Sequence, residues 1–217
     1  MMIRMLTDLF DKRIDSRSTV PAGVKGRTDM EANQIQSDEY GPYTIENIAS
    51  LPEGVRAELI NGDIFMMSTP STSHQRIVFN LSLAIGNYIH SHNGTCVPFT
   101  SPCAVYLDGK KTNKQWVEPD VFVVCDQNTI QDDGIYGPPD WIIEVASSSS
   151  IERNLVQKFG LYKEFGVKEY WIVNPMAGIV TMYEFVPISR AAQCRFEDEA
   201  SPSLYPDLKI RFHEMLS

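Results

Sequence analysis

The 217-residue sequence lacks several features that would each point to a class of protein. It has no apolar run of the roughly 18 residues that span a membrane, and no apolar core of a secretion signal. It also has no internal repeat and no glycine-rich phosphate-binding loop. We therefore expect neither a membrane protein, nor a repeat protein, nor a P-loop nucleotide hydrolase, and we expect a cytoplasmic location.

Cysteine is scarce, and its spacing forms no CxxC motif. The four cysteines are Cys96, Cys103, Cys125 and Cys194. Two of them lie in or beside strand-like runs. The pattern favours reduced, mostly buried thiols over a disulfide framework or a structural zinc site.

Basic residues are fewer than acidic residues over the whole chain. The formal net charge is −9 and the calculated pI is about 4.9. This balance disfavours nonspecific binding of polyanions, because affinity for phosphates comes largely from clustered lysines and arginines. Two local groups of lysines remain compatible with nucleic acid, although such groups more often form solvated faces: Lys110, Lys111 and Lys114, and Lys158, Lys163 and Lys168.

The first forty residues differ in character from the rest of the chain. They mix basic and acidic side chains and show little hydrophobic periodicity after Phe10, which is typical of a flexible extension. Met30 is an alternative start of the native chain. The whole chain is 43% hydrophobic, which suits one domain with its own core. We therefore expect an extension over 1–40 and one domain over 41–217.

Two acidic residues interrupt the most apolar segments. Alternation within 141–146 places Glu144 on a strand face with apolar neighbours, and no turn residue would release it to solvent. A buried carboxylate needs a cation nearby, from the protein or from a metal. Asp120 follows Pro119 and opens the apolar run 121–124, and strand ends are where α/β sheets present polar side chains to ligands. The two carboxylates can share one divalent ion, or each can pair with a lysine or arginine.

A lysine borders the apolar face of the next expected helix. Ser149 and Glu152 have the spacing of a capping box, and Gly166 stands where the helix would end, which predicts a helix over about 151–165. Lys158 borders the apolar stripe of this helix, so it can point back toward the edge of the sheet. The alternative is a lysine that extends along the surface into solvent.

Two further polar residues lie upstream. Asn61-Gly62 predicts a β-hairpin, in which Glu58 points either inward or toward a basic cross-strand neighbour. His74 lies in the first turn of a helix expected over 71–90. A histidine there usually makes a local polar contact, and the alternative is a catalytic or phosphate-contacting role.

Several short segments stand in a characteristic order along the chain: Glu58 to Asp63, His74-Gln75, Pro119-Asp120, Ile143-Glu144-Val145, Lys158 with Tyr162, and Gly166 to Pro175. No single segment is specific, but their order and spacing together are. In this respect the chain resembles the Uma-two family of restriction-endonuclease-like proteins, in the PD-(D/E)xK nuclease superfamily. The resemblance covers residues 43–214.

The resemblance implies a fold, a site and a substrate. The fold would be α/β, a restriction-endonuclease-like mixed twisted sheet flanked by helices. Asp120 and Glu144 would bind Mg²⁺ or Mn²⁺, Lys158 would act with the attacking water, and Glu58 would complete the acidic cluster. Further candidates for substrate contact are His74, Asn154 and Tyr162. The partner would be nucleic acid, expected to be DNA, and a homodimer is a further expectation because many such nucleases pair to cut two strands.

The chain departs from the family pattern at three positions. Ala146 stands where the superfamily usually has a lysine two residues after the second acid, so Lys158 is interpreted as a migrated substitute. Asn154 and Asn174 each stand where the family commonly has aspartate. These departures keep open an alternative: a catalytically weak or inactive nuclease fold that binds nucleic acid or a protein partner. An unrelated metal-dependent hydrolase is a third hypothesis.

The sequence of the C-terminal third predicts further strands. Apolar runs indicate one strand at 169–173 and another at 179–185, with a turn between them at 175–178. Residues 187–203 show no clear pattern and are expected to be irregular. Residues 204–216 are expected to close the fold with a strand and a short helix.

Overall fold

The computed structural model describes residues 41–147, 154–187 and 189–216, all of them part of one unit that spans 37–217. The extension expected over residues 1–40 lies outside the described residues. Within the described ranges, no helix is both long and apolar enough to cross a membrane.

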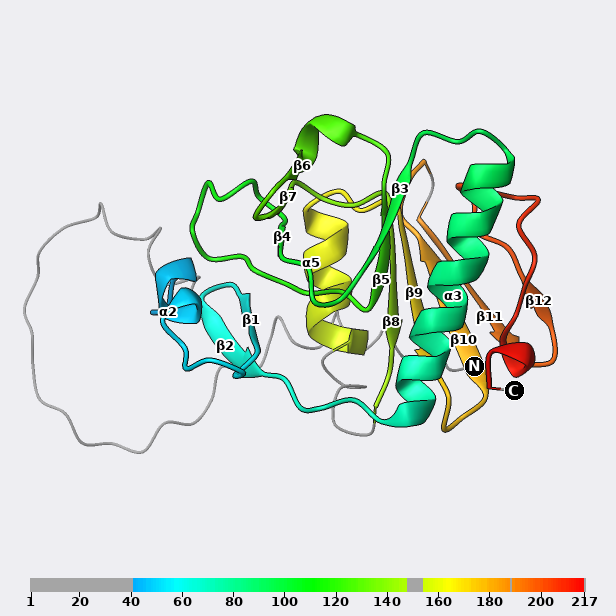
Figure 1. Ribbon diagram of the computed structural model, residues 1–217, viewed down its shortest axis with the longest axis horizontal. Coiled ribbons are helices and arrows are strands. Elements are labelled where there is room, and N and C mark those ends of the chain that lie inside the picture. The colour runs from blue at the N-terminus through cyan, green and yellow to red at the C-terminus, as the bar shows by residue number, and fades with distance from the viewer. Residues whose placement is uncertain (1–40, 148–153, 188, 217) are drawn as a thin grey trace, which may run out of the picture. The chain divides into compact units, whose positions relative to one another are not determined.

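A six-stranded mixed sheet forms the centre of the fold (Figure 1). Its strand order is β11-β10-β9-β8-β5-β3, in which β8 and β9 pair in parallel and the other neighbours pair antiparallel. The bounds are β3 Val97–Thr100, β5 Val121–Val124, β8 Trp141–Val145, β9 Glu169–Asn174, β10 Ile179–Glu184 and β11 Arg190–Arg195. The predicted α/β class with a mixed twisted sheet is confirmed.

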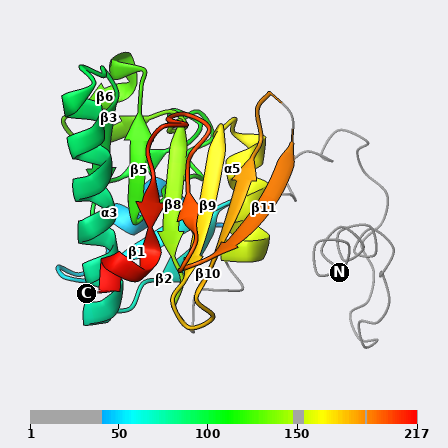
Figure 2. The same cartoon turned by 90° about the vertical axis from the view of Figure 1, so that its right-hand side faces the viewer.

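Two helices cover opposite faces of this sheet, α3 (Thr72–Ser91) on one side and α5 (Phe159–Glu164) on the other (Figure 2). Strand β8 alternates between the two layers, as predicted. Trp141, Ile143 and Val145 pack in the core that includes α3, and Ile142 and Ala146 pack in the core that includes α5. The alternation leaves Glu144 on the α5 side.

Helix α3 begins at the predicted place. Ser71 is its N-cap, and the Ser71 Oγ accepts a hydrogen bond from the backbone N–H of His74 at 3.2 Å. Ile77, Leu81 and Ile85 recur at spacings of four and are completely buried against the sheet. The cap and this buried stripe fix the first helical turn, which includes His74.

The predicted hairpin is also present. Strands β1 (Ala57–Ile60) and β2 (Asp63–Met66) pair antiparallel about Asn61 and Gly62, which have φ of 52° and 78°. Positive φ at both central residues is typical of a type I′ turn. A Cβ at Gly62 would lie 2.3 Å from the carbonyl oxygen of Gly41, so the turn also needs glycine for space.

The segment after β8 differs from the single α-helix predicted over about 151–165. Residues Asn154–Lys158 form a π-helical turn, η2, and α5 begins at Phe159. Ser149 and Glu152, the predicted capping pair, lie outside the described residues. Hydrophobic spacing does not distinguish a single π-turn from an α-turn, and π-turns are frequent at functional sites.

Residues 187–203, predicted to be irregular, contain two strands. Strand β11 pairs with β10, and β12 (Glu199–Ala200) pairs with β13 (Ile210–Arg211). Strand β11 lies at the edge of the sheet and is mostly exposed, so it carries no apolar alternation and is held by its hydrogen bonds to β10. The predicted closing strand and short helix are confirmed as β13 and η3 (Phe212–Leu216).

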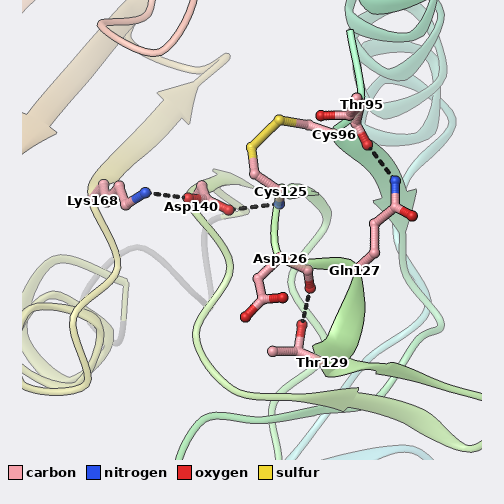
Figure 3. Close-up of a disulfide and its surroundings, with 8 residues drawn as sticks. All are labelled: Thr95, Cys96, Cys125, Asp126, Gln127, Thr129, Asp140 and Lys168. Atoms are coloured by element: carbon pink, nitrogen blue, oxygen red, sulfur yellow. Dashed lines mark hydrogen bonds and ion pairs between the residues drawn. A yellow bond between two sulfur atoms is a disulfide. The ribbon is translucent and has the colours of Figure 1, made fainter.

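Two cysteines form a disulfide, so the expectation of reduced thiols throughout is wrong (Figure 3). The Sγ atoms of Cys96 and Cys125 are 2.07 Å apart. Val97 pairs with Val124 in the β3–β5 ladder, so the two cysteines face each other one position beyond that pair. They are 29 residues apart in the chain, and this pairing depends on strand register. Cys103 and Cys194 are free thiols.

Short elements complete the α5 side of the sheet. A three-stranded sheet has the order β4-β7-β6, and its Val105 and Ile135 pack in the same core as Leu161 of α5. The remaining bounds are α2 Ile45–Ala49, β4 Val105–Tyr106, η1 Gln127–Thr129, β6 Ile130–Gln131 and β7 Gly134–Tyr136.

Candidate active site

Lys158 is buried between two carboxylates. Its Nζ lies 2.7 Å from Oε1 of Glu144 and 2.8 Å from Oε1 of Glu58, and the residue is 3% exposed. Burial alone would lower the pKa of this amine, but the charges of Glu144 and Glu58 outweigh burial and raise its pKa. Lys158 is therefore an ammonium at neutral pH. Of the two expected orientations, the structure has the one directed toward the sheet.

Glu58 reaches this cluster from strand β1, all four residues of which are buried. Its Oε1 accepts the hydrogen bond from Lys158 and a second one from the backbone N–H of Glu118 at 3.1 Å. Glu58 is 1% exposed, so it points inward rather than toward a cross-strand neighbour at the surface. Glu58 thus anchors the lysine to the hairpin.

Tyr162 supports the same cluster from α5. Its hydroxyl donates a hydrogen bond of 2.9 Å to Oε1 of Glu144, the oxygen that also accepts from Lys158. Burial raises the pKa of Tyr162 well above its ordinary value, so the hydroxyl keeps its proton. Tyr162 is completely buried, and contact with a substrate would require it to leave the core. The observed contact favours a role in fixing Glu144.

Asp120 is brought beside Glu144 by strand pairing. Val121 pairs with Ile143, so the next positions outward on β5 and β8 are Asp120 and Glu144. The backbone N–H of Val145 donates a hydrogen bond of 2.8 Å to Oδ2 of Asp120. The two carboxylates that the sequence placed at strand ends therefore lie side by side.

His74 contacts the same oxygen of Asp120 from the first turn of α3. Its Nε2 is 3.2 Å from Oδ2, while its Nδ1 is buried without a hydrogen-bond partner among the described residues. Burial acts to lower the pKa of His74, but the hydrogen bond and charge of Asp120, with the charge of Glu144, outweigh it and raise the pKa. His74 thus fixes Asp120 as an ion-pair partner, which is a local polar contact within the site.

The carboxyl group of Glu144 is strongly affected by its surroundings. Its pKa is raised to about 7, mainly by burial. The charge of Lys158 acts to lower this pKa, and the charges of Asp120 and Glu58 act to raise it. Burial is thus the main cause of the raised pKa, and the lowering by Lys158 offsets it only in part. A second cation beside Glu144 would favour its charged form further.

One pocket of about 440 Å³ is lined by the five side chains Glu58, His74, Asp120, Glu144 and Lys158. Its wall continues into the hydroxyl-rich segment 68–73, which the sequence analysis did not single out. The first turn of α3 and the C-terminal end of β8 lie at the same side of the molecule (Figure 1). Asn154, a predicted substrate contact, has its side chain outside the described set.

The donor set fits a hard divalent cation held by two protein ligands. Oδ1 of Asp120 and Oε2 of Glu144 accept no hydrogen bond from the described residues. Mg²⁺ commonly takes one or two carboxylates and fills its shell with waters and phosphate oxygens. No group of three or more His, Cys, Asp or Glu side chains is arranged for a metal within the described residues. A third ligand from Glu58 stays a prediction, because Lys158 lies between Glu58 and Glu144.

Comparison with known protein families identifies the family of this chain. The model of the Uma2 family, whose description is "Putative restriction endonuclease", matches residues 43–213. The chain belongs to the Uma2 family. The match spans β1 to β13 and so includes every residue of the candidate site that the structure describes.

Two similar proteins come from Synechocystis sp. and Anabaena variabilis. This Uma2 chain is 26% identical over 134 residues to the uncharacterized protein sll1609 of Synechocystis sp., covering 60% of this chain and 73% of the relative. Its fold matches the crystal structure of "a putative nuclease belonging to DUF820" from Anabaena variabilis with a TM-score of 0.64. That match has 17% identity and covers 81% of this chain and 98% of the other, which shows a common fold.

Proposed function

We propose that this Uma2 protein is a metal-dependent endonuclease that hydrolyses phosphodiester bonds of nucleic acid, with DNA as the substrate. The observation that carries the proposal is the convergence of Glu58, Asp120, Glu144 and Lys158 on one pocket. Acidic residues beside a buried lysine are the parts that metal-assisted phosphodiester hydrolysis requires. The family match supports the same reaction class. A homodimer stays a prediction.

In the proposed mechanism Asp120 and Glu144 would hold Mg²⁺ or Mn²⁺ through their oxygens. The bound ion would supply Lewis-acid activation of a water and stabilisation of charge on the phosphoryl oxygens. His74 and the Val145 N–H hold Asp120 through Oδ2, and Oδ1 would remain available to the ion. Tyr162 and Lys158 hold Glu144 through Oε1 in the same way.

Lys158 acts in this proposal as a charge and a hydrogen-bond donor. Two carboxylates hold it in the ammonium form, so it has no lone pair with which to deprotonate water. An ammonium at this place would position the attacking water or offset negative charge on the phosphoryl group in the transition state. Glu58 contributes by fixing the position and the charge of Lys158.

The test is cleavage of circular single-stranded DNA and of plasmid with Mg²⁺ or Mn²⁺, followed on gels. Asp120→Ala should reduce cleavage to background, because it removes one of two ion ligands. Asp132→Ala removes an exposed carboxylate that does not line the pocket and should cleave like the unmodified protein. Cleavage undiminished in Asp120→Ala would rule out the assignment.

The second candidate is a nuclease fold that binds nucleic acid or a protein partner without cutting. It is favoured by Ala146 at the usual lysine position and by the absence of a three-ligand metal group among the described residues. The candidates differ in metal binding. A catalytic site should show a rise in melting temperature with Mn²⁺ that disappears in Glu144→Gln, because only the native state binds the ion.

A further inference from the structure

We infer that the pocket beside Asp120 and Glu144 takes one unpaired nucleotide, so that the substrate is single-stranded or locally unpaired DNA and not an intact duplex. The inference deepens the proposed nuclease function and rests on it. Three features of the described residues support it: the size of the pocket, the apolar side chains at its rim and the distribution of positive charge.

The reacting groups line a half-open pocket. The pocket volume is about 440 Å³ and both Glu144 and Lys158 are buried in its wall. Pockets of roughly 300–1,000 Å³ typically enclose one small ligand of nucleotide size. A phosphodiester must therefore enter the pocket together with part of its own nucleotide. In a duplex that nucleotide has to leave the base stack first, whereas an unpaired nucleotide is already free to enter.

The rim offers an apolar contact for a nucleobase. Met66, at the end of β2, and Met176, in the turn between β9 and β10, both line the pocket and are 56% and 62% exposed. Pro70 and Pro175 also line it. Methionine is flexible and its sulfur contacts aromatic rings favourably, so it can pack on the face of any base. Every base has such a face, and this kind of contact tolerates any sequence.

The pocket lining that the structure describes supplies little positive charge for a duplex backbone. Among the described lining residues, Lys158 is the single lysine or arginine, and both of its close partners are carboxylates. Proteins that grip duplex DNA neutralise several phosphates with lysine and arginine. The lining here supplies mainly neutral hydroxyls, from Ser68, Thr69, Ser71 and Ser73. These groups can bond a single phosphate or sugar, which fits one nucleotide.

The first experiment compares three fluorescein-labelled DNAs of one sequence in the presence of Mn²⁺: a single strand, a blunt duplex and a duplex with an internal bulge. The full chain should cut the single strand, and the bulged duplex at the bulge, on the order of ten-fold faster than the blunt duplex or more. A blunt duplex cut as fast as the single strand overturns the inference.

A pair of variants tests the rim itself. Met176→Ala should raise KM for the single strand about two- to ten-fold, with little change in kcat, because it removes a base contact and no reacting group. Phe79→Ala is the matched control, since Phe79 is 64% exposed on α3 and does not line the pocket. If Met176→Ala and Phe79→Ala have the same KM, the proposed base contact is wrong.

Binding separates this inference from the proposed function. If none of the DNAs is cut, fluorescence anisotropy with the same labelled strands decides. Tighter binding of the single strand than of the duplex, weakened in Met176→Ala and unchanged in Phe79→Ala, would sustain the inference while the nuclease proposal fails. Equal binding of the two DNAs, or binding of neither, would overturn the inference as well.

Discussion

Lys158 and Glu58 form a buried ion pair across 100 positions of the chain, with 2.8 Å between Nζ and Oε1. The exposed fraction of the side chain is 4% for Lys158 and 1% for Glu58. The pair joins the hairpin β1–β2 to the turn that precedes α5, and the second contact of Lys158, with Glu144, joins both to the central sheet. One ammonium therefore fixes three separate elements of the fold around the pocket.

Replacing Lys158 should cost stability as well as activity. Lys158→Met leaves Glu58 and Glu144 buried without their cation, and breaking a buried pair on one side typically costs about 3–5 kcal/mol. Lys163→Met is the matched control, because Lys163 is exposed on α5. Urea unfolding at neutral pH measures the difference. Equal unfolding free energies for the two variants would contradict the buried pair.

The carboxyl of Glu144 should make stability depend on pH. Burial, only partly offset by Lys158, raises its pKa from 4.5 to about 7, so protonation favours the native state. A raised native pKa contributes stability below the unfolded pKa and loses it as pH rises through the native pKa. Between pH 5 and pH 8 the unfolding free energy should therefore fall by roughly 2–3 kcal/mol relative to Glu144→Gln.

Denaturant titrations of both proteins at several pH values measure this difference. Glu197→Gln, at an exposed carboxylate, serves as the control and should follow the unmodified protein at every pH. A gap between the unmodified protein and Glu144→Gln that stays constant, or that widens in favour of the unmodified protein as pH rises, would show that the native pKa of Glu144 is not raised.

His74 should act on metal affinity through Asp120. The Nε2–Oδ2 contact of 3.2 Å orients the carboxylate, and loss of such a partner typically weakens metal binding about 10–100-fold. His74→Leu should lose Mn²⁺ affinity by that factor in calorimetric titration. His74→Gln can still donate a hydrogen bond and should retain most of it. Equal affinity in the Leu variant and the unmodified protein would exclude this positioning role.

The disulfide should stabilise the sheet on the side of β3. Cys96 and Cys125 close a loop of 29 residues, and cross-links of that length typically contribute about 2–4 kcal/mol. Cys96→Ser should lower the unfolding free energy by that amount under non-reducing conditions, and Cys194→Ser, which removes a free thiol, should change it little. A count of four titratable thiols in the unfolded, unreduced protein would show that the bond is absent.

The elements that carry the site could be predicted because their local patterns are strong. Local neighbours in the sequence are enough to predict the apolar runs at 121–124 and 141–145, the Asn61-Gly62 turn and the start of the helix expected over 71–90. The need of Glu144 for a cation followed from burial alone, since an ionised carboxylate is costly without a partner. These features placed the charged groups on the correct elements.

The contacts among these groups could not be derived in the same way. That Glu58 and Glu144 share one ammonium depends on how a distant hairpin packs on the sheet, and no periodicity encodes it. The Cys96–Cys125 bond depends on the register of β3 and β5. Strand β11 was missed because an exposed edge strand is held by backbone hydrogen bonds and shows no apolar alternation.

The most direct test of the account is an anomalous-scattering map of crystals soaked in Mn²⁺. The account predicts a peak in the pocket within coordination distance of both Asp120 and Glu144, and its loss in Asp120→Ala. A map without a peak there, or with manganese bound only at other acidic side chains, would contradict the two-carboxylate metal site on which the proposed nuclease activity depends.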